Sequence, residues 1–168
     1  MKWLKLCAVA VLLSAGSVTA SVEEDSLVDS TTVMLSWIKA RAPYDPAMID
    51  ALHSPRVKIR SREFFEQVAC RGSRRVCHRI AWYNGGGTIF LRDDIDFSSV
   101  EGAGHLLHEL VHYVQEGSET FLDVNECNRF RREREAYDLQ KTYLIEHGHY
   151  PTFAIQLSPP LGCGVAIR

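Results

Sequence analysis

The chain has 168 residues, of which 46% are hydrophobic and 24% are charged, and its formal net charge is -2. A chain of this length predicts one domain with a modest hydrophobic core. The near balance of acidic and basic residues argues against a nucleic-acid-binding protein and against attachment to an acidic membrane surface. The composition therefore predicts an ordinary globular domain.

The first twenty residues form a separate segment with the features of a secretory signal peptide. Lys2 and Lys5 precede an apolar run over residues 6–15, and small residues end the segment at Ala20, where we expect cleavage. A membrane anchor is the alternative, but the run is shorter than the roughly 20 residues that a spanning helix needs. We predict a signal peptide over 1–20, one domain over 21–168, no membrane span in the mature form, and a periplasmic or secreted location.

The first half of the mature chain predicts one helix followed by short strands. Residues 26–40 place an apolar stripe on one helical face, and prolines follow it. Residues 57–60 predict a strand, and Ser61 can cap a helix that ends near residue 69. The stripe consists of Leu27, Thr31, Met34, Leu35 and Ile38.

A β-hairpin and two long helices are expected next. The β-prone segments 79–83 and 88–91 flank an Asn-Gly-Gly-Gly turn, which is a hairpin signal. Ser98 and Glu101 match a capping box, and the helix that they begin should span about 99–116. A second helix should run from about 123–126 to about 147. The predicted class is α+β, with a small sheet packed against helices.

Export gives the cysteines a role, because disulfides form in oxidising compartments. Four cysteines follow the predicted signal peptide, and three pairings of them are open. We favour Cys70–Cys77, because the intervening loop contains Gly72 and Ser73 and can close easily. Cys127–Cys163 then follows as the second disulfide.

The sequence HELVH over residues 108–112 predicts a metal site. His108 and His112 are four residues apart on the predicted helix, so their imidazoles project from one face and can reach one tetrahedral zinc ion. Glu109 can lie beside a metal-bound water without being a ligand, as general base and then general acid. The alternative is an ordinary helix that carries histidines and no metal.

A catalytic zinc site needs a third protein ligand and one open position. Gln115 and Ser118 stand where the metzincin pattern requires Gly and His, which excludes that class. On the next helix, Glu135-Ala136 resembles the downstream Glu-Ala motif of the gluzincin metallopeptidases. The motifs HELVHYVQ and EREAYDLQ also resemble those of small exported bacterial proteins with gluzincin-like sites. This resemblance covers about residues 79–140 and implies Glu135 as the third ligand, while Glu133 stays open.

The resemblance implies a zincin-like domain with one Zn²⁺ per chain. It implies a short sheet whose edge strand, 88–91, pairs with a peptide or protein substrate, and an active-site helix packed antiparallel to the glutamate-bearing helix. The expected function is that of an exported zinc-dependent hydrolase, most simply a metallopeptidase. The alternative is a non-catalytic zinc-binding or partner-binding protein on the same scaffold. The residue that stabilises the transition state stays open among Tyr113, Tyr137, Tyr143, His147, His149 and Tyr150.

Overall fold

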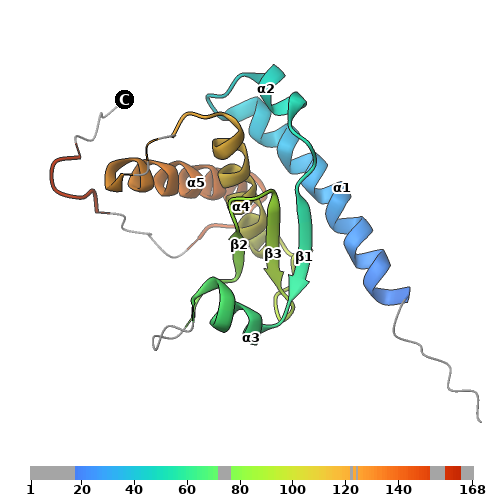
Figure 1. Cartoon of the computed structure of the whole chain (residues 1–168). Coiled ribbons are helices and arrows are strands. Elements are labelled where there is room, and N and C mark those ends of the chain that lie inside the picture. The colour runs from blue at the N-terminus through green and yellow to red at the C-terminus, as the bar shows by residue number, and fades with distance from the viewer. Residues whose placement is uncertain (1–17, 72–76, 122, 124, 152–157, 164–168) are drawn as a thin grey trace, which may run out of the picture.

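The computed structural model describes residues 18–71, 77–121, 123, 125–151 and 158–163, with the backbone alone for 18–26. Its fold is α+β, as predicted, with helices around a small sheet (Figure 1). The elements in chain order are α1 (Val18–Arg41), α2 (Pro46–Ala51), β1 (Arg56–Arg60), α3 (Arg62–Phe64) with a π-helical turn η1 (Phe65–Ala69), β2 (Ala81–Tyr83), β3 (Thr88–Arg92), α4 (Val100–Gly117) and α5 (Glu126–Glu146).

The described residues form a three-stranded sheet in the order β1-β3-β2. The predicted hairpin is confirmed, since β2 and β3 are antiparallel with Trp82 opposite Phe90. β1 pairs with β3 in parallel on the other side. The prediction that 88–91 forms the sheet edge is therefore wrong: β3 is the central strand, with Ile89 and Leu91 fully buried, and β2 and β1 are the edges.

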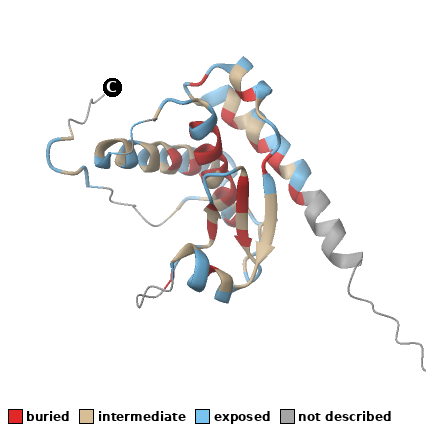
Figure 2. Ribbon diagram, viewed as in Figure 1, coloured by how far each residue is buried: buried red, intermediate tan, exposed pale blue. Residues whose placement is uncertain are grey.

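α4 lies at the centre of the molecule, between the sheet and the other long helices (Figure 2). Five of its apolar side chains are completely buried, because this part of α4 contacts α1, α5 and β2. The predicted stripe of α1 faces this core, although the helix begins earlier than residue 26. The core residues of α4 are Leu106, Leu107, Leu110, Val111 and Val114.

The helix ends follow ordinary capping chemistry. α4 begins one residue later than predicted, because Ser99 and not Ser98 accepts the backbone N–H of Gly102. The Ser98 hydroxyl instead donates to Asp96. Asn125 caps α5 by accepting the N–H of Asn128. α2, which the sequence did not predict, is a single short helix with proline in its first turn.

Both predicted disulfides are present, Cys70–Cys77 and Cys127–Cys163. The second ties the C-terminal segment to the first turn of α5. Two disulfides in a chain of this size fit an oxidising, extracytoplasmic environment. None of the described helices is long and apolar enough to cross a membrane. Residues 1–17 of the predicted signal peptide lie outside the described residues, and its last three begin α1.

Candidate metal centre

Three side chains from α4 and α5 converge as a potential metal-binding group. The Nε2 atoms of His108 and His112 each lie 3.5 Å from one oxygen of the Glu133 carboxylate. The ligand atoms of all three residues lie within 4.8 Å of one another. Two imidazoles and one carboxylate are a donor set that zinc takes in catalytic sites. The group could therefore hold a metal ion.

The glutamate of this group is Glu133, so the prediction of Glu135 as third ligand needs correction. α5 packs against α4 along a buried ridge that begins at Ala136 and continues through Gln140 and Leu144. At about 100° per residue, Glu133 and Glu135 lie about 200° apart around the helix and flank this ridge on opposite sides. Glu135 instead accepts a hydrogen bond from the Tyr44 hydroxyl at 2.6 Å.

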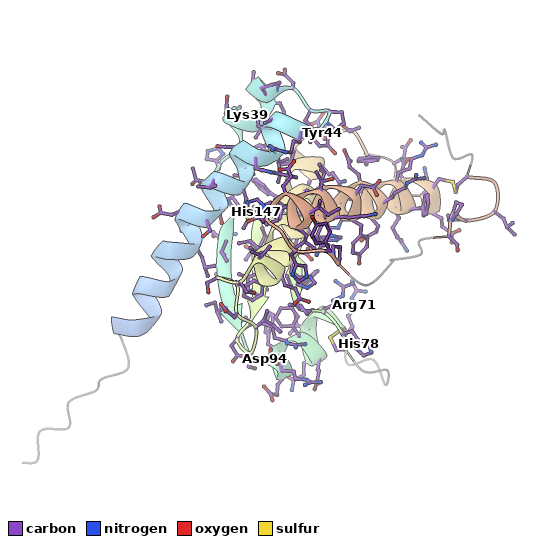
Figure 3. The ribbon with its side chains drawn as sticks, turned by 180° about the vertical axis from the view of Figure 1, so that it is seen from behind. Lys39, Tyr44, Arg71, His78, Asp94 and His147 are labelled. Atoms are coloured by element: carbon purple, nitrogen blue, oxygen red, sulfur yellow. A yellow bond between two sulfur atoms is a disulfide. The ribbon has the colours of Figure 1, made fainter. Side chains whose placement is uncertain are left out.

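The view with side chains agrees with this division. Tyr44 lies on one side of α5, whereas Arg71 and His78 lie on the other (Figure 3). Arg71 and His78 line the same cavity as the Glu133 carboxylate, and Tyr44 does not. The side of α5 that carries Glu133 thus faces open space, while the side that carries Glu135 faces the packed connector between α1 and α2.

Two buried glutamines contact the Nδ1 atoms of the histidines, which are the ring nitrogens that point away from Glu133. Nδ1 of His112 lies 2.8 Å from Oε1 of Gln115, and Nδ1 of His108 lies 3.2 Å from Oε1 of Gln140. Both glutamine side chains are almost inaccessible, at 1% and 3% exposure. An Nδ1–H that donates to an amide oxygen leaves the Nε2 lone pair of the ring free for a metal. When both rings are neutral and carry their proton on Nδ1, both Nε2 lone pairs face Glu133.

In the metal-free protein, the histidine rings can instead carry protons on Nε2, and these protons point to the Glu133 carboxylate. Burial opposes ionisation of Glu133, but hydrogen bonds and charge attraction from the two histidines hold its pKa well below the ordinary value of 4.5. Burial likewise lowers the pKa of His112, but the contact with Glu133 and the nearby Glu109 carboxylate outweigh it and raise that pKa. Glu133 is therefore a carboxylate at neutral pH, the form that a metal requires.

Glu109 is hydrogen-bonded to β2, an edge strand of the sheet. Its Oε2 accepts the backbone N–H of Tyr83 at 2.7 Å. The N–H groups of Asn84 and Arg92 bond across the hairpin to the carbonyls of Thr88 and Ile80. Since alternate residues of a strand point their backbone groups to opposite sides, those of Ala81 and Tyr83 face away from β3, toward the open edge.

A cavity of about 1350 Å³ opens over this site. Its walls come from α4, α5 and the segment that leads into β2, and both histidines, Glu109 and Glu133 line it. Of the six residues proposed to stabilise a transition state, Tyr137 is the one that lines this cavity. Its ring lies 4.3 Å from the His108 ring, and burial with the charges of Glu133 and Glu109 raises its pKa. Tyr137 thus keeps its phenolic proton at neutral pH.

The sequence did not reveal the roles of Gln115 and Gln140. Gln115 follows His112 by three residues, a spacing that brings two side chains together on a helix, and this was a usable signal. Gln140 lies on another helix, so only the packing of α5 on α4 identifies it. Compared with family models, with curated proteins and with solved structures, the chain has no significant match.

Proposed function

We propose that this protein is a zinc-dependent hydrolase that acts on peptide or protein amides in an extracytoplasmic compartment. One observation carries the proposal: two buried imidazoles and a carboxylate converge on one point at the wall of an open cavity, with a further carboxylate, Glu109, beside them. His108, His112 and Glu133 would hold the ion. Zinc in such a site supplies a Lewis acid that acidifies water and polarises a carbonyl.

Each residue around the ligands has a chemical role in this proposal. Glu109 takes a proton from the attacking water and returns it to the departing amine. The N–H of Tyr83 holds this carboxylate toward the cavity at 2.7 Å. Tyr137 offers a hydrogen-bond donor to the oxygen on which negative charge develops, because its raised pKa keeps the phenol neutral.

The open edge of β2 offers the place for a substrate backbone. Ala81 presents its N–H and C=O to the cavity side, and Tyr83 presents its C=O. An extended peptide can pair with such an edge through main-chain hydrogen bonds. Its scissile amide would then lie next to Glu109, which is bonded to the same edge. The substrate therefore pairs with β2 in this proposal, and not with the central strand over 88–91.

The test combines metal content with turnover. Wild-type protein, equilibrated with zinc and dialysed against a mild chelator, should hold about one zinc per chain, as expected for a single three-ligand site. Glu133→Ala should lose it. Glu109→Gln should keep the zinc but lose cleavage of a peptide library read by mass spectrometry.

Three results would contradict the proposal. A wild-type chain with intact fold and disulfides but no zinc would make His108 and His112 ordinary helix histidines. Zinc binding together with equal cleavage by wild type and Glu109→Gln would remove the role given to Glu109. Zinc binding without any cleavage would leave a non-catalytic zinc protein.

A further inference from the structure

Behind His112 lies a chain of hydrogen bonds that ends at the connector between α1 and α2. Gln115 donates from Nε2 to Oε2 of Glu135 at 2.9 Å and to the carbonyl of Arg132 at 3.0 Å. The Tyr44 hydroxyl donates to the same Oε2 of Glu135 at 2.6 Å. Every member is wholly or partly buried, and neither Glu135 nor Tyr44 lines the cavity.

The partners of the Gln115 amide leave it one orientation. A glutamine side chain can present either its oxygen or its nitrogen to a neighbour, and only the partners decide which. A carboxylate and a backbone carbonyl, from Glu135 and Arg132, both accept hydrogen bonds, so they must meet the NH₂ group. The amide oxygen then faces His112 at 2.8 Å, and a second donor, Nε of Arg132, lies 3.4 Å from it.

This orientation decides the tautomer of a metal ligand. The Gln115 amide oxygen lies 2.8 Å from Nδ1, closer than the Glu133 oxygen lies to Nε2 at 3.5 Å, and therefore favours the proton of neutral His112 on Nδ1, with the Nε2 lone pair toward Glu133. The reversed amide would present NH₂ to Nδ1, place the ring proton on Nε2 and block coordination. We propose that Glu135, supported by Tyr44, is a positioning residue that fixes the Gln115 amide and thereby the metal-binding tautomer of His112.

The second glutamine provides an internal comparison. Gln140 lies between His108 at 3.2 Å and Nδ1 of His105 at 3.4 Å. A neutral imidazole nitrogen can donate or accept, so His105 does not dictate the orientation of this amide as a carboxylate does. A change at Glu135 should therefore alter the tautomer of His112 and leave that of His108 as it was.

The proposal rests on the metal site of the proposed function, but its first test needs no metal. Nitrogen NMR of the histidine rings in the metal-free full-length chain, at alkaline pH where the rings are neutral, reports the tautomer of each. We expect His112 in the Nδ1–H form in wild type. In Glu135→Gln, whose amide can either donate or accept, we expect a mixture with the Nε2–H form and an unchanged His108.

A paired exchange distinguishes positioning from general structural support. In the double variant Gln115→Glu, Glu135→Gln, a carboxylate at 115 accepts from both His112 and the new amide, so the Nδ1–H form should return. Asp138→Asn, which alters an exposed carboxylate on the same helix, is the matched control. Zinc affinity from chelator competition should fall about 10- to 100-fold in Glu135→Gln, recover in the double variant and stay unchanged in the control.

An Nε2–H form of His112 in wild type would overturn the proposal by itself. So would a Glu135→Gln variant with the wild-type tautomer and the zinc affinity of the control. If Glu135→Gln does not fold, the double variant decides the question. An Nε2–H ring of His112 in that variant contradicts the proposal, and an Nδ1–H ring supports it. A wild type that shows the Nδ1–H tautomer but binds no zinc would refute the proposed function while leaving the positioning role intact.

Discussion

The first turn of α4, the helix that carries both histidines, contains a glycine at which a substitution should have a large effect on stability. At Gly102, in the first turn of α4, an added Cβ would lie 2.1 Å from the carbonyl oxygen of Asp96 and 2.8 Å from Cα of Phe97. Both obstacles are backbone atoms, so no side-chain rotation can relieve the contact. Gly102→Ala must therefore displace either α4 or the loop before it.

One favourable and two unfavourable contributions decide the stability of the Gly102→Ala variant. Helix propensity favours alanine over glycine by about 1 kcal/mol. Overpacking costs about 1–3 kcal/mol, and a backbone obstacle at this distance places Gly102→Ala at the upper end. The same movement disturbs the cap, because Ser99 both caps the N–H of Gly102 and bonds to the Asp96 carbonyl, at about 1 kcal/mol more. We expect a net loss of about 3 kcal/mol in the free energy of unfolding.

Urea denaturation with the disulfides intact measures this loss, and thermal denaturation should show the midpoint lowered by roughly 6–12 °C. Gly104→Ala is the comparison in the same helix. Its Cβ would lie 2.8 Å from Cδ2 of Leu144, the mobile end of a side chain, so overpacking and propensity should nearly cancel. A Gly102→Ala variant as stable as wild type, or more stable, would refute the packing that the structure gives to the start of α4.

Two further predictions concern the disulfides and the tyrosines. Replacing Cys127 and Cys163 by serine should lower the free energy of unfolding by about 4 kcal/mol, and replacing Cys70 and Cys77 should lower it by about 2.5 kcal/mol. The difference arises because the first disulfide spans 36 residues and the second spans 7, so the longer loop loses more entropy on closure. Urea midpoints in the opposite order would contradict this prediction. Burial raises the pKa of Tyr44 above 10.0 and that of Tyr83 to about 12, so the folded chain retains protons that the unfolded chain releases near pH 10. The stability that these two tyrosines contribute should be fully present below that pH and should fall above it. Urea midpoints that stay constant into alkaline solution would disprove the raised pKa values.

Local periodicity was enough to predict much of this molecule. Histidines four residues apart on an amphipathic helix must share a face, so the pairing of His108 with His112 followed from the sequence. The hairpin around residues 84–87 and the short Cys70–Cys77 disulfide followed from turn chemistry and chain proximity. The proposed catalytic role of Glu109 rests on the same local pattern and stays a prediction.

Only tertiary packing decided the other features. β3 became the central strand because β1, more than twenty residues earlier in the chain, pairs with it in parallel, and no local signal records such a pairing. The third member of the metal group was decided by the rotation of α5 about its own axis. Ala136 fixes that rotation by packing without exposed surface. The sequence motif favoured Glu135 and left Glu133 open, but Glu133 faces the histidines and Glu135 faces Tyr44, because a helix turns by about 200° between them.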